Sequence, residues 1–190
     1  AAGSHSGEPS HVSAARSMLA KAGLSEDDLR CGPHAPYNAQ AALVLAAAGI
    51  EPGRIHNNCS GKHAGILALA MHIGAGAADY LEVTHPAESA ILEGCAEMLG
   101  VPRASFAIGV DGCGIPAIAT PLSIAARFFA KFAAPDRFAS KWREALVRVR
   151  DAMMAHPEMI AGTGDFDTAL MSAAPGDNMG KGGAEGYHAS

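Results

Sequence analysis

Glycine and proline divide this chain into segments, most of which carry the apolar spacing of α-helices. Helices are predicted where apolar residues recur every three or four positions, over residues 9–21, 38–48, 62–73, 85–99, 116–133 and 136–156. Residues 105–109 are the best strand candidate, and they deliver Asp111 and Cys113 at their carboxyl end. The pattern therefore predicts a helix-rich α/β (α+β) fold whose central sheet is incomplete in this segment.

Composition excludes several classes of protein. The chain has 190 residues, of which 49% are hydrophobic and 17% charged, so it is not disordered. A net charge of -5 without a dense basic run argues against a nucleic-acid partner. The apolar stretches are too short for a bilayer, and no leader of charged then apolar residues opens the chain. Four cysteines without a CxxC pattern do not form a secreted disulfide scaffold, so we predict a cytoplasmic protein.

Both ends of the sequence read as cut. Residues 1–7 start inside a loop of small residues without an initiator methionine. Residues 181–190 run to the end as if a strand were about to begin. We therefore expect residues 1–190 to be the central part of one larger domain whose N-terminal and C-terminal parts are missing.

The stretch 57–65 (Asn-Asn-Cys-Ser-Gly-Lys-His-Ala-Gly) places a thiol and an amine three residues apart, just before a helix. A thiolate at a helix start gains from the partial positive charge there, and a nearby ammonium lowers its pKa further. Cys59 and Lys62 are therefore candidates for chemistry. An ordinary helix cap, with Cys59 buried and Lys62 on the surface, explains the same residues.

A second stretch, residues 109–116, has the same character and carries Asp111 and Cys113. Two thiolates suit a borderline ion such as zinc, and a neutral lysine amine can complete the ligand set. Cys59, Lys62 and Cys113 are thus a candidate zinc site, with buried cysteines or a thiol pair as the alternatives.

Three further loops are rich in small or polar residues. Residues 4–9 precede a helix and are read either as a cap or as part of a site. Residues 161–167 lack the Gly-Lys-Ser/Thr of a phosphate loop and are read as a turn. Residues 181–186 place a lysine before two glycines. The nine histidines show no HExxH or paired HxH spacing, which gives a histidine-only metal site little support.

Five stretches together resemble, in their order along the chain, the rhizobial-type (class 3) L-asparaginases, the L-asparaginase II family. They are Ser4–Pro9, Asn57–Gly65, Gly109–Pro116, His156–Asp167 and Lys181–Gly186. The resemblance runs from about residue 3 to residue 188. It implies a fold like that of serine β-lactamases and glutaminases, with a central sheet flanked by helices, and a homodimer. The activity it implies is hydrolysis of L-asparagine to aspartate and ammonia, so that the expected partner is a small-molecule substrate.

The resemblance also implies roles for individual residues. The family uses two Ser–Lys pairs. The serine of the first pair, an SxxK motif on an early helix, is the expected nucleophile, and the second pair falls on Ser4 and Lys181 in this chain. A serine hydroxyl becomes a nucleophile when a neutral amine accepts its proton, and a lysine crowded by other cations can be neutral near pH 7.

The metal and substrate contacts follow in the same way. The family's zinc site of two cysteines and one lysine maps onto Cys59, Lys62 and Cys113. Asp111 matches a carboxylate that holds the amino end of the substrate. We also expect Asn58 and His5 to bind the substrate.

One departure from the family bears on the activity. No SxxK motif occurs in the chain, and we expect this first Ser–Lys pair upstream of residue 1. Two alternatives to an asparaginase therefore stay open. One is a non-catalytic zinc-binding fragment, and the other is a penicillin-recognising or glutaminase-like acyl enzyme, which Lys181-Gly182-Gly183 would suit.

Overall fold

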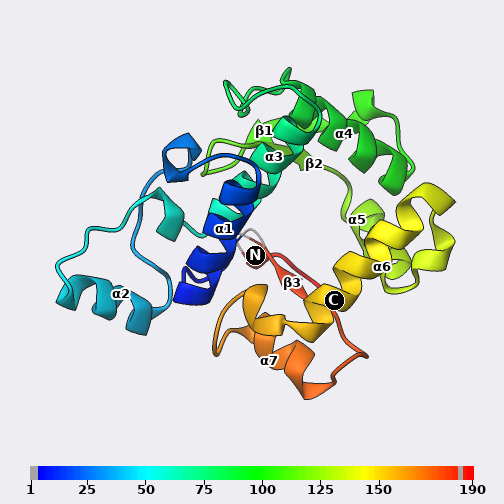
Figure 1. Cartoon of the computed structure of the whole chain (residues 1–190). Coiled ribbons are helices and arrows are strands. Elements are labelled where there is room, and N and C mark those ends of the chain that lie inside the picture. Colours follow the sequence, from blue (N-terminus) through cyan, green and yellow to red (C-terminus); the bar gives the residue numbers. More distant parts are fainter. Residues whose placement is uncertain (1–3, 184–185) are drawn as a thin grey trace. The chain divides into compact units, whose positions relative to one another are not determined.

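The computed structural model describes residues 4–183 and 186–190. Their contacts divide them into two compact units. The first unit holds the described residues up to Ile91 together with Ile108–Ala117, and the second holds Leu92–Ala107 and the described residues from Ile118 to Ser190. Figure 1 follows the chain through both units in sequence colours.

The first unit is organised by two helices, α1 (Pro9–Lys21) and α3 (Ser60–His72), which pack against each other. Pro9 occupies the first position of α1, where its missing N–H costs nothing. The ring nitrogen Nδ1 of His11 accepts the Glu8 backbone N–H at 3.1 Å and so closes the helix start. A shorter helix, α2 (Ala39–Ala47), begins at Asn38, whose side chain accepts the Ala41 N–H at 2.9 Å.

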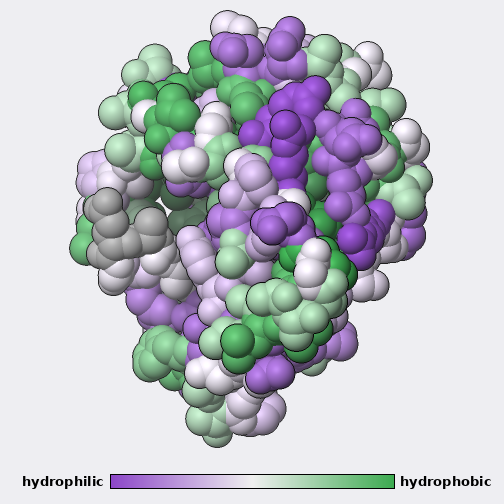
Figure 2. All heavy atoms as spheres, turned by 90° about the vertical axis from the view of Figure 1, so that its left-hand side faces the viewer, coloured by the Kyte–Doolittle hydropathy of each residue, from purple (hydrophilic) through white to green (hydrophobic). Residues whose placement is uncertain are grey.

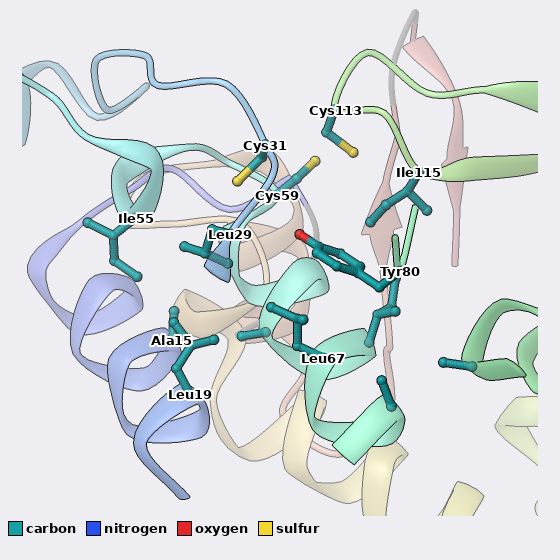
Figure 3. Packing of buried hydrophobic residues seen from close by; sticks show 14 of the residues in the cluster. Ala15, Leu19, Leu29, Cys31, Ile55, Cys59, Leu67, Tyr80, Cys113 and Ile115 are labelled. Carbon is teal, nitrogen blue, oxygen red and sulfur yellow. The ribbon is translucent and has the colours of Figure 1, made fainter. Parts of the chain in front are cut away.

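Helical spacing puts apolar side chains of α1 and α3 on facing sides, as the sequence predicts. Leu19 of α1 and Leu67 of α3 are fully or almost fully buried, and the Tyr80 ring from the loop after α3 belongs to the same core. Cys31, Cys59 and Cys113 lie at the edge of the same core, where they are visible in the close view of Figure 3. The thiols and the apolar core are therefore one continuous packing unit.

The prediction of a helix over residues 116–133 is wrong in its first part. Residues Pro116–Ala119 form strand β2, which pairs with β1 (Ala107–Val110) in a two-stranded sheet, and the helix α5 begins only at Leu122. The turn between the strands is closed by the Asp111 N–H, which donates to the Ile115 carbonyl at 2.8 Å. Alanine-rich sequence favours a helix, but this hairpin overrides the local preference.

The second unit contains the helices α5 (Leu122–Ala133), α6 (Ser140–Ala155) and α7 (Phe166–Ala173). Its core is built on Phe132, Phe138, Leu146 and Met179. The short strands β3 (Lys181–Gly182) and β4 (His188–Ala189) pair antiparallel, with Gly182 opposite His188. Helix α4 (Pro86–Leu99) contributes residues to both units.

The expectation of a helix-rich α/β fold is confirmed, and the sheet content of the described residues consists of two small two-stranded sheets. Membership of a single larger domain stays a prediction. None of the helices in the described part of the chain is long and apolar enough to cross a bilayer. On the face drawn in Figure 2, hydrophilic and hydrophobic residues are interspersed.

Gly7 and Gly23 form a matched pair that separates backbone strain from crowding. Both have φ of +74°, but a β-carbon at Gly7 would lie 2.8 Å from the His56 carbonyl oxygen, whereas one at Gly23 would meet nothing within 4 Å. We expect Gly23→Ala to cost about 1–2 kcal/mol of unfolding free energy through the left-handed backbone. Gly7→Ala should cost a further ~1–3 kcal/mol from the clash. Chemical denaturation of the two variants checks this, and equal losses would contradict it.

Candidate functional site

The turn into α3 holds Cys59 in a fixed position. Asn57 is buried, and its side-chain N–H donates to the Gly32 carbonyl at 2.6 Å. Its side-chain oxygen accepts the Cys59 backbone N–H at 2.7 Å. Cys59 is the residue that precedes the first turn of α3, so its sulfur lies at the positive end of the helix dipole. The turn is therefore a helix cap with a buried Cys59, and it also places the Cys59 thiol where it is a candidate for chemistry.

His5 ties the N-terminal loop to the same turn. Its ring is fully buried, and its backbone N–H donates to the Asn58 carbonyl at 3.1 Å. The ring Nδ1 accepts the Gly7 N–H at 3.1 Å, and Nε2 lies 3.1 Å from the Ser60 hydroxyl and 3.4 Å from the Gly61 backbone nitrogen. His5 thus braces the loop against α3, and its predicted contact with substrate stays a prediction.

Ser4 lies beside Cys59 in a strained conformation. Its φ is 65°, in the left-handed region that non-glycine residues rarely adopt, and its side chain is exposed. The next residue, His5, donates its backbone N–H to the carbonyl of Asn58, which directly precedes Cys59. Backbone strain of this kind persists where the surrounding structure enforces it, and it gathers at functional sites. The exposed hydroxyl of Ser4 is thereby carried on a fixed backbone next to the thiols.

Two thiols and a carboxylate meet in the first unit. A ligand atom from each of Cys59, Asp111 and Cys113 lies within 4.8 Å of the other two, and we refer to these residues as the Cys–Asp–Cys cluster. Figure 3 shows Cys59, at the start of α3, and Cys113, in the loop after β1, with their sulfurs directed toward the same space. Lys62 completes the group, because its Nζ donates to Asp111 Oδ2 at 2.5 Å.

The two thiols differ in charge. A hydrogen bond from Cys59 is the main reason that the pKa of Cys113 is lowered to about 4, and His63, the Ile115 backbone and the Lys62 charge add to it. The pKa of Cys59 is raised, because its hydrogen is shared with Cys113 and because it is buried. The lowered pKa favours the thiolate form of Cys113 in the metal-free protein, and the Cys113 sulfur lies 3.5 Å from Asp111 Oδ2.

Lys62 is the cation beside the thiols and the Asp111 carboxylate. Burial disfavours the ammonium, but the hydrogen bond to Asp111 and the nearby thiols hold the pKa of Lys62 above its usual value. The same hydrogen bond keeps the pKa of Asp111 below its usual value. Lys62 is thus an ammonium in the metal-free protein, and it must lose a proton before it can act as a ligand.

The donor set fits zinc. Two cysteine sulfurs with a third nitrogen or oxygen donor form a common zinc environment, and a catalytic site leaves one position open. Either Lys62 or Asp111 is placed to supply the third donor. Cys31 is buried in the same core, but its thiol donates to the Arg54 carbonyl at 3.5 Å, and it is not part of the Cys–Asp–Cys cluster.

Asn58 is held by a residue that the sequence analysis did not single out. The His34 Nε2 accepts the Asn58 backbone N–H at 3.0 Å, and the Asn58 side-chain oxygen lies 3.2 Å from the same nitrogen. The His34 ring stacks on Tyr37 at 4.9 Å between centroids. In the sequence, His34 stands out only because it lies between Pro33 and Pro36, and no local pattern predicts its contact with Asn58. The substrate contact of Asn58 stays a prediction.

Lys181 belongs to the second unit, on β3. Asp167, at the start of α7, is buried, and its Oδ2 accepts the Gly182 N–H at 2.5 Å. Its other oxygen lies 3.1 Å from His188 Nε2 on β4, so that one carboxylate holds both short strands. Asp167, the last residue of the 161–167 stretch that the sequence analysis interprets as a turn, therefore anchors the strand that carries Lys181. Pairing of Lys181 with Ser4 stays a prediction.

The asymmetry of the thiols predicts a pH titration. Because a lowered pKa favours the deprotonated form, the metal-free protein should hold one thiolate from neutral pH down to about pH 4. Ultraviolet thiolate absorbance should show this, and Cys113→Ala should abolish it. Cys31→Ala is the control, since burial raises the pKa of Cys31 to about 11. Absorbance that emerges only as pH rises through about 9 would contradict the assignment.

Comparison with known families now gives the site a context. The family model described as L-asparaginase II matches residues 1–190, the whole of the chain. No curated protein matches the chain closely enough to count as a relative. The match over the full length confirms the resemblance carried by the five stretches of sequence. The chain belongs to the L-asparaginase II family, a family of asparagine amidohydrolases.

Proposed function

We propose that this protein hydrolyses the side-chain amide of L-asparagine to give L-aspartate and ammonia, with Ser–Lys acyl-enzyme chemistry next to a zinc centre. The observation that carries the proposal is the convergence of Ser4, Lys62 and the Cys–Asp–Cys cluster on the first turn of α3. Family membership supports the reaction class. Polar groups gathered at a helix start suit a small, charged, polar substrate.

Asp111 is the group we assign to the amino end of the substrate. Its side chain is 38% exposed, and its low pKa keeps it anionic at neutral pH. Lys62 and the Gly112 N–H hold the two carboxylate oxygens, the latter at 2.7 Å, so the carboxylate is oriented before substrate arrives. Asn58 would supply a further hydrogen bond at the opposite end of the same turn.

Ser4 and Lys181 form the acid–base pair of the proposal. The neutral Lys181 amine, with the Ser4 hydroxyl beside it, takes up the proton of the attacking serine hydroxyl of the SxxK pair and passes it to the amide nitrogen as the C–N bond breaks and ammonia leaves. Water cleaves the resulting acyl ester and releases aspartate. Ser4 suits this role because its hydroxyl is exposed on a strained backbone that α3 holds in place.

Cys59 and Cys113, with Lys62 as third donor, would hold the zinc ion. The donors fit, because the sulfurs and the neighbouring carboxylate lie within 4.8 Å of one another. Bound zinc supplies a fixed positive charge beside the substrate. The residues of the chain do the rest: Lys62 and Asp111 exchange their mutual hydrogen bond for contacts with metal and substrate, and the α3 dipole favours anionic groups.

Three assays separate this function from its alternatives. Turnover of asparagine supports the proposal, turnover of glutamine alone points to a glutaminase-like enzyme, and turnover of a chromogenic β-lactam points to a penicillin-recognising one. Zinc binding without turnover of any of the three would favour the non-catalytic alternative. The homodimer implied by the family is part of the proposal and is tested by the mass of the protein in solution.

Removal of the proposed base should slow the reaction. We expect Lys181→Ala to lower kcat for asparagine by about 10²-fold or more, as loss of a general base does. Lys141→Ala is the matched control. Lys141 is an exposed lysine of α6 that pairs with Glu97 of α4, so its removal should leave kcat unchanged. Steady-state ammonia release measures both. Unchanged turnover by Lys181→Ala would remove Lys181 from the mechanism.

The protons released on zinc binding identify the third ligand. At neutral pH Cys59 and Lys62 are protonated and Cys113 is not, so a Cys–Lys–Cys site should release about two protons per zinc. A site completed by Asp111 should release about one. Calorimetry in buffers of different ionisation enthalpy counts them, and Lys62→Met should lower the count. Release of about one proton by the unaltered protein would exclude Lys62 as a ligand.

A further inference from the structure

The loop from Gly32 to Asn38 is tied at both ends to segments of the candidate site. At its start the Gly32 carbonyl accepts the Asn57 side-chain N–H at 2.6 Å. At its end the Asn38 backbone N–H donates to the Ser6 carbonyl at 2.9 Å. His34 lies between these two ties and is half-buried. The loop therefore holds the His34 imidazole next to the turn into α3.

Two backbone contacts fix the tautomer of His34. Its Nδ1 lies 2.6 Å from the Ala35 carbonyl oxygen, which can only accept, so Nδ1 carries the ring proton. Its Nε2 lies 3.0 Å from the Asn58 backbone nitrogen, whose N–H can only donate, so Nε2 offers a lone pair. The Tyr37 ring stacks on the imidazole with the two planes 16° apart, which restricts rotation of the His34 ring. A neutral imidazole satisfies both contacts, whereas an imidazolium would set its Nε2–H against the Asn58 N–H.

The side-chain amide of Asn58 has to match this ring. The terminal atom that lies 3.2 Å from the same Nε2 is the oxygen in one orientation of the amide and the nitrogen in the other. The two orientations differ by a half-turn and fill the same space. With the oxygen there, two lone pairs face each other. With the nitrogen there, the amide N–H shares the Nε2 lone pair with the backbone N–H, so His34 favours this orientation.

The second terminal atom of the Asn58 amide has no protein partner among the residues that the structure describes. In the orientation that His34 favours, this atom is the carbonyl oxygen, which is an acceptor. An acceptor suits an N–H of the substrate's side-chain amide. It is poorly suited to aspartate, which carries no N–H at that end and brings a negative charge to the oxygen.

We propose that His34 is a positioning residue that keeps the Asn58 side-chain oxygen free, so that Asn58 binds the amide N–H of asparagine and discriminates against the product aspartate. The inference rests on the proposed function and adds to it the group that tells substrate from product. A site that is built to bond a substrate N–H rejects the analogue that lacks it. Asp111, assigned to the amino end, contacts a part that substrate and product share.

The position of the ring proton tests the orientation without any turnover. A long-range proton–nitrogen correlation NMR spectrum of protein labelled in histidine separates protonated from unprotonated ring nitrogens, and His34→Gln identifies the signals of His34. We expect the proton on Nδ1 and none on Nε2 at neutral pH. A proton on Nε2, alone or together with one on Nδ1, would overturn the proposed orientation of Asn58.

A comparison of substrate with product tests the discrimination. We expect His34→Ala to raise the KM for asparagine by about 3- to 10-fold, the worth of one hydrogen bond. The inhibition constant of aspartate should stay the same or fall, because the released amide can turn its N–H toward the carboxylate. A merely structural loss would weaken both equally and would contradict the role of His34. His72→Leu, at an exposed histidine of α3, should change neither constant.

The outcomes separate this inference from the proposed function. If the unaltered protein does not turn over asparagine, the proposed function fails, and the NMR spectrum still decides the orientation of Asn58. If it does, and His34→Ala folds with an unchanged KM, the role of His34 alone is wrong. Should His34→Ala not fold, Asn58→Ala should show the same split between substrate and product, and equal weakening of both would overturn the discrimination.

Discussion

The close approach of the Cys59 and Cys113 sulfurs is the constraint around which the site of the first unit is built. It places one negative charge at the edge of an apolar core, where a lone charge would be costly. The Lys62 ammonium and the start of α3 supply positive charge there, and Lys62 also pairs with Asp111. The two cysteines are therefore placed to bind a cation, and the lowered pKa of Cys113 favours its thiolate before a metal binds.

Several segments of the first unit hold the two cysteines in position. Asn57 fixes the turn that carries Cys59, and His5 braces that turn against the N-terminal loop. The hairpin between β1 and β2 brings Cys113 back to α3 from fifty residues later in the chain. Each support is a buried polar group with a defined partner, which makes the region specific as well as stable. A site built this way keeps its geometry in the absence of substrate.

Sequence reasoning reached the site through residue chemistry and missed what depends on distant contacts. The Asn57–Gly65 and Gly109–Pro116 stretches were recognised because thiol, amine, carboxylate and glycine occur together in each. His34, which holds Asn58, was missed, since a single half-buried histidine carries no local signal. The helix predicted over residues 116–133 failed in its first turns for a related reason. Pairing with β1 is a contact across the turn, and it outweighed the helical preference of alanine.

X-ray absorption spectroscopy at the zinc edge of the zinc-loaded protein tests the central claim most directly, because it reports the atoms bound to the ion. The account predicts two sulfur neighbours at about 2.3 Å, with the remaining neighbours nitrogen or oxygen at about 2.0–2.2 Å. Cys113→Ala should leave one sulfur neighbour. A first shell of nitrogen and oxygen alone in the unaltered protein would contradict the account, because the thiol pair would then not be the metal centre.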